Sequence, residues 1–509
     1  MQTPDIPCTN RADQPDLLAH DSFYRALEAR DTRFDGVFFT GVKTTRIYCR
    51  PVCAARTPRA SSCEFFKSAA AAEAAGFRPC LRCRPELAPY AIQQNLAYAV
   101  WQRIAAGALN DTGDGSGIEQ LATTVGLSSR QLRRVLMQHF GVSPIELAQT
   151  QRLLFAKKLL HETSLPMTDV AYAAGFGSVR RFNALFATRY GIAPTTIRRT
   201  LVPAGIAGSD ALTLRLAYRP PLAWDTMLRY LAARAVPGIE AVDNHCYVRS
   251  VQWQGLAGPC GWLRVSHLPR NNLLLLEVAP GLAGVLMPLL AQVRCQFDLD
   301  ANPTLIAEHL QQDPLLAPHS LITPGLRVPG SFDVFELALR AVLGQQVSVA
   351  GATTLSGRLV AQFGAPARTP FSQITHHTPQ AQTLAHASIE SIAHIGLPRS
   401  RAETITALAR FATEGHLTMA PGGTLEQAVS ALRSVRGIGE WTAQYIALRA
   451  LRFPNAFPAG DLGLQQAASA GAPGMQRLTE KQLLTRSKYW APWRGYAAML
   501  LWHSLNPAP

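Results

Sequence analysis

The chain has 509 residues, 48% of them apolar and 16% charged, a balance typical of a globular protein and not of a disordered one. At about 150 residues per domain, this length predicts three or four domains and excludes a single core. The 49 Lys and Arg residues against 34 Asp and Glu leave a formal charge of +15, which favours a polyanionic partner such as nucleic acid.

The N-terminal residues contain no apolar run that would form a signal peptide. The longest apolar stretch, at residues 282–293, is too short to span a bilayer. A protein that is not exported keeps its thiols reduced, so the nine cysteines indicate metal binding or catalysis before disulfides. We therefore expect a cytoplasmic protein that does not engage a membrane.

The first motif consists of two cysteine pairs. Cys49 and Cys53 lie in TTRIYCRPVC, and Cys80 and Cys83 lie in GFRPCLRCRPE after a loop of 26 residues. Four thiolates at this spacing suit a tetrahedral Zn²⁺ site, which a unit of this size is expected to need in order to fold. A purely structural zinc knuckle is one alternative. A thioredoxin-like pair at Cys80 and Cys83 is a weaker one, because no suitable strand precedes it.

Residues 16–90 around these cysteines resemble the N-terminal zinc domain of the Ada family, the adaptive-response regulators. The resemblance implies that Cys49 is both a zinc ligand and the irreversible acceptor of a methyl group from a methylated DNA phosphate. Bound zinc would keep the sulfur deprotonated at neutral pH, so the nucleophile needs no separate base. Methylation would also remove a negative charge from the cluster, and we expect this change to tighten DNA binding.

Four arginines are expected to line the DNA-facing surface of this zinc domain: Arg46, Arg50, Arg56 and Arg59. The remaining cysteines match no ligand spacing and are predicted to be small buried hydrophobic residues. They are Cys8, Cys63, Cys246, Cys260 and Cys295. Ada proteins often carry a second methyltransferase domain with a Pro-Cys-His-Arg motif. This tetrapeptide does not occur in the chain, so repair of O6-alkylguanine is not supported.

Residues 91–200 are rich in arginine, are predicted to be helical and contain an internal repeat at an offset of 49 to 50 residues. In each copy an alanine (Ala122, Ala171) precedes a glycine (Gly126, Gly175) by four positions, and an aromatic-Gly pair and a proline follow. The alanine lets two helices cross closely, and the glycine permits the tight turn between them. The repeat therefore predicts two helix-turn-helix units.

The second helix of each unit carries side chains suited to phosphates and base edges. They are Arg130, Arg133 and Arg134 in the first unit, and Arg180, Arg181 and Asn183 in the second. The pair resembles the AraC-type transcription-factor module, which also follows the zinc domain in the Ada family. The resemblance implies binding to double-stranded promoter DNA and an RNA polymerase partner. The alternative is a helical repeat with a solvated basic face.

Residues 205–209 are predicted to be a linker, and a mixed α/β region follows them. Strands are predicted at residues 212–218, 245–253 and 273–278, and helices at residues 224–236 and after Gly281. After Phe332 the chain becomes Ala/Leu-rich and is predicted to be helical to its Trp-rich end.

The C-terminal region contains a Gly437-Ile438-Gly439 turn between two helical patterns, and Asp461 follows Pro-Ala-Gly about twenty residues later. Free backbone N–H groups at such a turn can bind a DNA phosphate. Taken singly, each feature has a common structural interpretation: a plain helix-helix turn for the glycines, and a helix N-cap for the aspartate.

Together, FELALRAVLGQQVSVAGA, the glycine turn, FPAGDLGL and WAPWRGYAAMLLWH resemble the helix-hairpin-helix glycosylases of the AlkA branch, which excise 3-methyladenine. The resemblance covers about residues 208–509. It implies that Asp461 is the catalytic carboxylate, which stabilises an oxocarbenium-like sugar and orients water. Arg436 departs from the pattern, since the hairpin more often has proline there. Gln345 and Gln346 match a family motif, and we expect only a supporting structural role for them.

Relatives that also cut the strand carry a lysine where this chain has Trp441. Without that amine no Schiff base can form, so we expect a monofunctional glycosylase. The resemblance implies that Trp441, Tyr445 and Trp493 bind the flipped, positively charged base by cation–π contact. Core packing is the alternative for each of these three. Trp490 and Trp502 are assigned to the core.

These inferences predict a multidomain α+β protein with four domains. They are a small zinc-binding α/β domain (1–90), an all-α double helix-turn-helix domain (91–204), a mixed α/β domain (208–320) and an all-α helix-hairpin-helix glycosylase domain (321–509). We expect a monomer, because no dimerisation coiled coil is evident. Two rival interpretations stay open: a transcription regulator with a non-catalytic C-terminal half, and a glycosylase whose zinc site is only structural.

Overall fold

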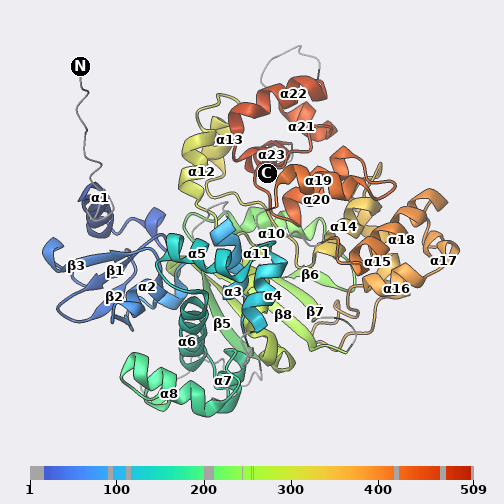
Figure 1. Ribbon diagram of the computed structural model, residues 1–509. Coiled ribbons are helices and arrows are strands. Elements are labelled where there is room, and N and C mark those ends of the chain that lie inside the picture. The colour runs from blue at the N-terminus through green and yellow to red at the C-terminus, as the bar shows by residue number, and fades with distance from the viewer. Residues whose placement is uncertain are drawn as a thin grey trace, which may run out of the picture.

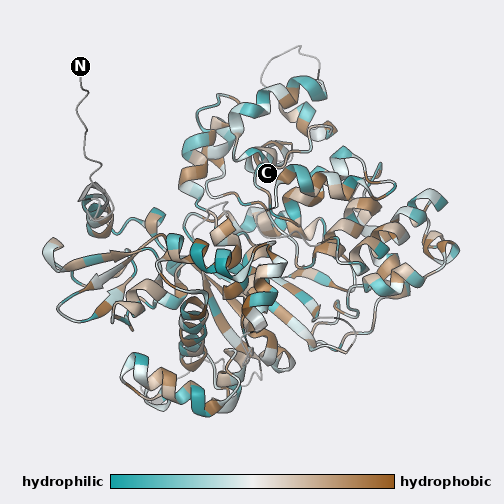
Figure 2. Ribbon diagram, in the orientation of Figure 1, coloured by the Kyte–Doolittle hydropathy of each residue, from teal (hydrophilic) through white to brown (hydrophobic). Residues whose placement is uncertain are grey.

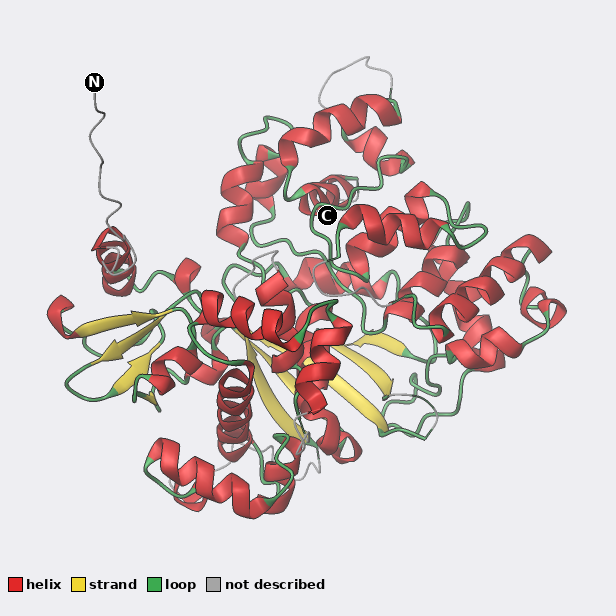
Figure 3. Cartoon of the chain, in the orientation of Figure 1, coloured by secondary structure: helices red, strands yellow, loops and turns green. Residues whose placement is uncertain are grey.

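The computed structural model describes residues 17–89, 96–110, 116–199, 211–243, 245–253, 255, 257–417, 423–469 and 477–505. Within these residues the predicted multidomain α+β class is confirmed, with two separate sheets among many helices (Figure 3). The predicted linker at 205–209 and Cys8 lie outside the described residues. None of the described helices is both long and apolar enough to cross a bilayer.

The N-terminal domain is a four-stranded sheet in the order β3-β1-β2-β4, with two helices (Figure 1). Its elements are α1 (Leu17–Glu28), β1 (Phe39–Val42), β2 (Ile47–Cys49), β3 (Cys63–Phe66), α2 (Ala69–Ala74) and β4 (Arg78–Pro79). β2 pairs with β4 in parallel, so the two strands end at the same edge of the sheet. Both cysteine pairs begin at that edge.

The next domain is all helical, and its helices reproduce the sequence repeat. They are α3 (Leu96–Ala105), α4 (Ser116–Thr124), α5 (Ser129–Phe140), α6 (Pro144–Glu162), α7 (Met167–Ala173), α8 (Val179–Tyr190) and α9 (Pro194–Arg199). Gly126 and Gly175, which open the two turns, have φ angles of 69° and 81°, a conformation that strongly favours glycine. Two helix-turn-helix units, α4–α5 and α7–α8, are therefore confirmed, with α6 between them.

The mixed α/β domain contains an antiparallel sheet in the order β5-β9-β8-β7-β6. Its elements are β5 (Leu212–Ala217), α10 (Trp224–Ala232), β6 (Glu240–Asp243), β7 (Cys246–Gln252), β8 (Cys260–Leu268), β9 (Leu273–Val278), α11 (Leu286–Gln296), α12 (Pro303–Leu310) and α13 (Ala317–Ile322). The three predicted strands are confirmed. The sequence analysis missed β6 and β8, although Leu263 and Val265 of β8 alternate with polar residues and are fully buried.

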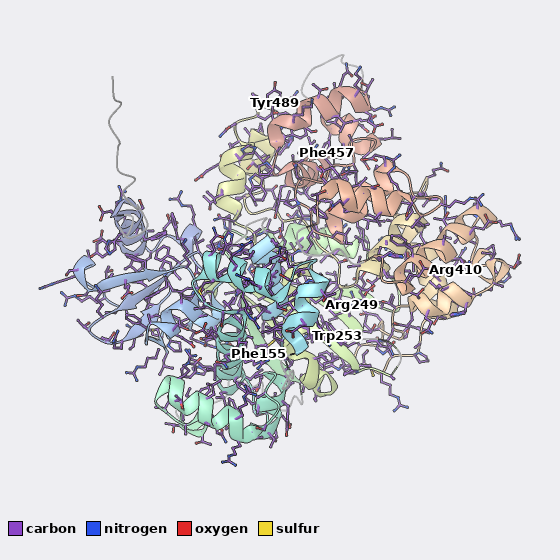
Figure 4. All side chains as sticks on the ribbon, in the orientation of Figure 1. Phe155, Arg249, Trp253, Arg410, Phe457 and Tyr489 are labelled. Atoms are coloured by element: carbon purple, nitrogen blue, oxygen red, sulfur yellow. The ribbon has the colours of Figure 1, made fainter. Side chains whose placement is uncertain are left out.

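The C-terminal domain is all helical, as predicted, and its buried side chains form one core. Its helices are α14 (Val334–Leu343), α15 (Val349–Phe363), α16 (Ala381–His386), α17 (Ile389–Ala393), α18 (Arg399–Thr413), α19 (Leu425–Arg433), α20 (Glu440–Arg449), α21 (Leu462–Ala467), α22 (Glu480–Ser487) and α23 (Arg494–Ser504). Arg249 of β7 attaches this domain to the sheet, because its Nη2 donates to Glu336 Oε2 of α14 at 2.7 Å. Figure 4 shows Arg249 between the sheet and these helices.

The second helix-turn-helix unit and the mixed α/β domain share one hydrophobic core. It runs from Leu153 of α6 through Ile197 of α9 to the sheet residues Leu214 and Leu276. In Figure 1, α6 stands beside β5, and Figure 2 shows apolar residues along both elements. The shared core fixes this unit against the sheet.

Buried charges on α6 reach into the N-terminal domain. Lys157, with no exposed side-chain surface, donates from Nζ to Glu86 Oε2 (2.8 Å) and to the carbonyl of Cys80 (3.4 Å). Arg84 donates to Glu86 at 3.0 Å and to Glu162 at 2.6 Å. Because these groups are almost fully removed from water, they depend on one another for compensation.

The same helix also reaches the mixed α/β domain. Glu162 Oε2 accepts from Lys158 Nζ at 2.8 Å and from the backbone N–H of Arg215 on β5 at 3.0 Å. Lys158 in turn donates to the carbonyl of Arg215. Glu162 therefore connects three parts of the chain: the N-terminal domain, α6 and the first strand of the larger sheet.

We predict that Glu162→Ala lowers the free energy of unfolding by about 3–5 kcal/mol, because Lys158 is left buried without its carboxylate and Arg84 keeps only Glu86. The measurement is denaturant unfolding of both proteins. Glu308→Ala is the matched control, since Glu308 forms an exposed pair with Arg33 and should cost less than about 1 kcal/mol. Equal losses from the two substitutions would contradict the prediction.

Candidate metal site, DNA-binding helices and active site

The parallel pairing of β2 and β4 brings the two cysteine pairs together. Tyr48 lies opposite Pro79, and the backbone N–H of Cys80 donates to the carbonyl of Tyr48 at 3.0 Å. Cys49, the last residue of β2, is therefore adjacent to Cys80, the residue after β4. The turns that follow each strand supply Cys53 and Cys83.

The four sulfur atoms of Cys49, Cys53, Cys80 and Cys83 all lie within 4.8 Å of one another. A tetrahedral Zn²⁺ with Zn–S bonds of about 2.3 Å requires sulfurs about 3.8 Å apart, so the cluster fits this ion after a small contraction. Cys53 and Cys80 are buried, whereas Cys49 and Cys83 are half-buried. Cys49 thus combines a ligand position with the exposure that a nucleophile needs.

The prediction for Arg50 is wrong. Its side chain is only 12% exposed and pairs with Asp35, and its Nη1 donates to the carbonyl of Cys83 at 3.2 Å. The backbone N–H of Arg50 also donates to Cys83 Sγ at 3.4 Å. Arg50 therefore supports the cysteine loop instead of facing solvent. The other three predicted arginines of this surface are exposed: Arg46, Arg56 and Arg59.

The two repeat helices expose the predicted basic residues. On α5, Leu132, Leu136 and Phe140 face the core, and on α8 the corresponding residues are Phe182, Phe186 and Tyr190. The opposite faces carry the exposed side chains Arg130, Arg133, Arg134, Arg180, Arg181 and Asn183. Both helices thus have the amphipathic arrangement that a recognition helix needs.

A buried carboxyl group, which the sequence analysis did not single out, links the cysteine strand to these helices. Glu73 of α2 accepts from the Tyr48 hydroxyl at 3.1 Å and from the Thr150 hydroxyl of α6 at 3.0 Å. Arg189 of α8 lies 3.8 Å away. Burial raises the pKa of Glu73 to about 7, although Arg189 acts to lower it. Its fully buried partner Tyr48 immediately precedes Cys49.

In the C-terminal domain, Asp461 is the N-cap of α21, and its Oδ1 accepts from the backbone N–H of Leu464 at 3.0 Å. Two indole groups also donate to this carboxylate: Trp502 to Oδ1 and Trp441 to Oδ2, each at 3.0 Å. The N-cap interpretation of Asp461 is therefore confirmed, and it does not exclude the functional one, because the cap orients a half-buried carboxylate that lies between two tryptophans.

The aromatic residues are not all arranged as predicted. Trp441 and Tyr445 stack, with ring centroids 5.4 Å apart and planes 11° from parallel. Trp502, assigned to the core by the sequence analysis, packs against the core and also donates to Asp461 and lies edge-on to Tyr445. Trp493 makes its ring contact with Tyr496 and none with the stacked pair. The assignment of Trp490 to the core is confirmed, since it is 1% exposed.

The glycine turn connects α19 to α20 as a hairpin. Gly437 requires glycine, because its φ is +89° and an added Cβ would lie 2.0 Å from Thr404 Oγ1. Gly439 is the N-cap of α20. Ile438 is buried, and its N–H donates to Val435, so the exposed residues at the turn are the two glycines and Arg436.

Gln345 has a contact that explains its presence in the motif. Its side-chain amide donates to the carbonyl of Gly437 at 2.9 Å and to Thr442 at 3.1 Å, which ties the end of α14 to the hairpin. Gln346 is exposed and has a φ of +58°.

Three cysteine predictions are wrong. Cys260, the first residue of β8, is exposed, and Cys246 and Cys295 are half-buried. Cys63 is buried, as predicted.

The chain matches four family models in succession. They are the metal binding domain of Ada (residues 22–86), a helix-turn-helix domain (121–200), the AlkA N-terminal domain (213–333) and the HhH-GPD superfamily base excision DNA repair protein (339–492). The order is the one that the sequence analysis predicts, and it supports a zinc ion in the four-cysteine cluster.

Relatives match over most of the chain. A protein of Mycobacterium tuberculosis named "Probable bifunctional transcriptional activator/DNA repair enzyme AlkA" is 38% identical over 498 residues, which cover 96% of this chain and 97% of that protein. DNA-3-methyladenine glycosylase 2 of Escherichia coli is 35% identical over 292 residues, or 57% of this chain and 96% of that protein. A solved 3-methyladenine DNA glycosylase from Archaeoglobus fulgidus has the same fold over 58% of this chain and 99% of its own, with a TM-score of 0.50 and 20% identity.

The buried carboxyl group of Glu73 predicts a pH effect on stability. Its folded pKa of about 7 lies above the ordinary value of 4.5, so the folded state holds this proton more tightly. The parent protein should therefore lose stability as pH rises from about 4.5 to about 7, by up to about 3 kcal/mol. Glu73→Gln, which resembles the protonated form, should not show this loss of stability.

The measurement is the difference in unfolding free energy between the parent and Glu73→Gln at several pH values, so that titrations common to both proteins cancel. A difference that stays constant between about pH 4.5 and about pH 7 would contradict the raised pKa.

Proposed function

Because the chain belongs to the family of bifunctional transcriptional activators and DNA repair enzymes that join an Ada-type zinc domain to an AlkA-type glycosylase, we propose that it repairs alkylated DNA by two separate reactions. The C-terminal half excises N-alkylated purines of the 3-methyladenine type. The zinc domain accepts a methyl group from DNA methylphosphotriesters and thereby switches on transcription. The observation that carries the first reaction is the fixed carboxylate of Asp461.

In the excision reaction, Asp461 is the catalytic carboxylate. As the N-glycosidic bond breaks, positive charge develops on the sugar, and a preorganised carboxylate stabilises that charge without having to reorient. Three N–H donors hold the two oxygens of Asp461. Among the described contacts Oδ2 accepts only from Trp441 and has capacity for one more hydrogen bond, which a water nucleophile can donate.

The aromatic residues beside Asp461 form the base pocket. The flipped base lies against Trp441 and Tyr445, and the electron-rich ring faces favour a purine that carries positive charge. Trp502, which holds Asp461 from the other side, joins this pocket in place of Trp493. Since Trp441 stands where strand-cutting relatives have lysine, the reaction stops at base release.

DNA is held by the hairpin and by the repeat helices. Gly437 and Gly439 present backbone N–H groups to a phosphate at the start of α20, buried Ile438 fixes the turn between them, and exposed Arg436 adds a cation there. The arginine-bearing faces of α5 and α8 enter the major groove at promoter sites. In this proposal the protein acts as a monomer and contacts RNA polymerase when it activates transcription.

In the methyl-transfer reaction, Cys49 is the nucleophile of the zinc domain. When bound, zinc keeps the four sulfurs deprotonated. The sulfur of Cys49 forms a bond to the methyl carbon while the methyl–oxygen bond of the phosphotriester breaks, and the oxygen leaves as an ordinary phosphodiester anion. Cys49 becomes a thioether, the negative charge of the cluster falls by one, and repulsion from DNA decreases.

The four proposed domains divide this work. Residues 1–90 accept the methyl group, residues 91–204 bind promoter DNA, residues 208–320 support the base pocket and residues 321–509 excise the base. The two reactive centres, Cys49 and Asp461, belong to different domains, so each reaction can be tested without the other.

The first experiment measures release of free 3-methyladenine from methylated DNA by the parent and by Asp461→Asn. We expect the substitution to lower the single-turnover rate by at least about a hundredfold, since it removes the charge that stabilises the transition state. Asparagine remains a good N-cap, so α21 should be preserved.

Asp313→Asn is the matched control, because Asp313 also accepts from an indole, that of Trp490, and lies outside the pocket. It should retain base release per folded molecule. No release by the parent would favour the rival interpretation, in which the C-terminal half binds DNA without cleaving.

The second experiment incubates the zinc-loaded protein with DNA that carries methylphosphotriesters and locates the added methyl group by peptide mass. We expect one methyl on Cys49, none on the exposed thiol of Cys260, and tighter promoter binding afterwards. Asp461→Asn should be methylated as the parent is. A protein that retains zinc and gains no methyl would indicate a structural metal site.

A further inference from the structure

Arg449 lies one helical turn after Tyr445 on α20, beneath the stacked aromatic pair. It is 3% exposed. Its guanidinium donates to the Tyr445 hydroxyl at 2.8 Å and to the Tyr230 hydroxyl at 2.5 Å. It also donates to the carbonyls of Pro329 and Gly330. A single buried side chain therefore joins the aromatic pair, helix α10 of the mixed α/β domain and the segment that enters the C-terminal domain.

These contacts extend to the catalytic carboxylate. Arg449 fixes the hydroxyl end of Tyr445, and the Tyr445 ring stacks on Trp441 at 5.4 Å. The indole N–H of Trp441 donates to Asp461 Oδ2. A change in the tilt of Tyr445 would consequently alter both a wall of the base pocket and one of the donors that orient Asp461.

Arg449 also places a positive charge close to the pocket. The oxygens that accept its hydrogen bonds belong to two phenols and two backbone carbonyls, so none of these acceptors neutralises its charge. Its guanidinium carbon lies 5.6 Å from the ring centroid of Tyr445 and 4.9 Å from that of Tyr230. Such a cation works against the binding of a positively charged base unless Tyr445 ionises to a phenolate, which compensates the charge.

We propose that Arg449 is a positioning residue that determines whether the pocket prefers cationic or neutral damaged bases, because it holds Tyr445 in the stack and places a cation against the Tyr445 hydroxyl. This inference rests on the proposed excision of alkylated purines. As a phenolate, Tyr445 neutralises the arginine and presents an electron-rich ring to a cationic base. As a phenol, it leaves the arginine charge uncompensated, which disfavours the cationic base and leaves a neutral one unaffected.

The charges around Tyr445 support this assignment. Burial opposes its ionisation, but Arg449, Arg234, the Tyr230 hydroxyl and Arg340 together lower the pKa of Tyr445 to about 8. The carboxylate that acts on Arg449 and Arg340, Glu240, accepts from Tyr247 and from the backbone N–H of Val236. Asp461 is separated from Tyr445 by the Trp441 ring. Cations thus outnumber carboxylates around the phenol.

The test compares release of 3-methyladenine, which is cationic while attached to the sugar, with release of neutral 1,N6-ethenoadenine, as single-turnover rates after subtraction of spontaneous loss. For the parent, we expect the cationic-to-neutral ratio to rise at least about fivefold from about pH 7 to about pH 9, as Tyr445 ionises. Tyr445→Phe keeps the stacked ring and should abolish this rise.

Two substitutions of Arg449 separate its charge from its contacts. Arg449→Met should abolish the rise and slow release of both bases, because Tyr445 loses its nearest cation and its anchor. Arg449→Lys keeps a cation but donates to fewer acceptors, so it should retain the rise while slowing both bases. A pH-independent ratio in the parent, or an unchanged rise in Tyr445→Phe, would overturn the proposal.

A spectroscopic titration separates failure of this inference from failure of the proposed function. The near-ultraviolet tyrosinate signal of the parent minus that of Tyr445→Phe should show one group titrating near pH 8, and that group should disappear in Arg449→Met. If the parent releases no base, the proposed function fails, yet the titration still tests whether Arg449 favours the phenolate. Absence of this group in the parent would overturn the inference on its own.

Discussion

The buried charges of helix α6 determine how the N-terminal sheet, the helical repeat and the larger sheet sit together. Lys157 holds the carbonyl of Cys80, and Glu162 holds the backbone of Arg215 at the start of the larger sheet. Both ends of this network are removed from water, where an unpaired charge is strongly unfavourable. The cysteine loop, α6 and β5 can therefore move apart only if several charges lose their partners together. The second helix-turn-helix unit, whose core continues into the sheet, is held by the same constraint.

Each reactive centre is in fact positioned by a neighbouring domain. The cysteine loop receives Lys157 from the helical repeat, and the base pocket receives Tyr230 from the mixed α/β domain through Arg449. An isolated zinc domain or an isolated C-terminal domain would lack these contacts. The fusion of these parts in one chain thus contributes to the geometry of both sites, in addition to joining the two activities proposed for the protein.

Much of this arrangement follows from local rules that a sequence displays. Cysteine spacing predicts the metal cluster, and the glycines at 126 and 175 predict the two turns because few other residues adopt their φ angles. The exposed faces of α5 and α8 follow from the helical period. These features depend on neighbours in the sequence, which is why they could be predicted without the structure.

Features that depend on contacts between distant segments could not be predicted in this way. Arg50 resembles a surface arginine until Asp35 is seen beside it, and the burial of Glu73 depends on Tyr48 and α6. Trp493 caps the start of α23 and Trp502 lies near its end, and only the packing of α23 against α21 decides which indole reaches Asp461. Motif matching alone does not reveal that it is Trp502.

Asp461 shows why a structural and a catalytic interpretation of one residue need not compete. An aspartate at a helix N-cap has its carboxylate fixed by the backbone of the first turn, here by the N–H of Leu464. A carboxylate that must stabilise a developing cation gains from the same fixation, because little reorganisation is needed when the charge appears. The cap holds one oxygen, and the two indoles complete the orientation of the group. The role that made Asp461 look ordinary in the sequence is therefore compatible with the catalytic role proposed for it.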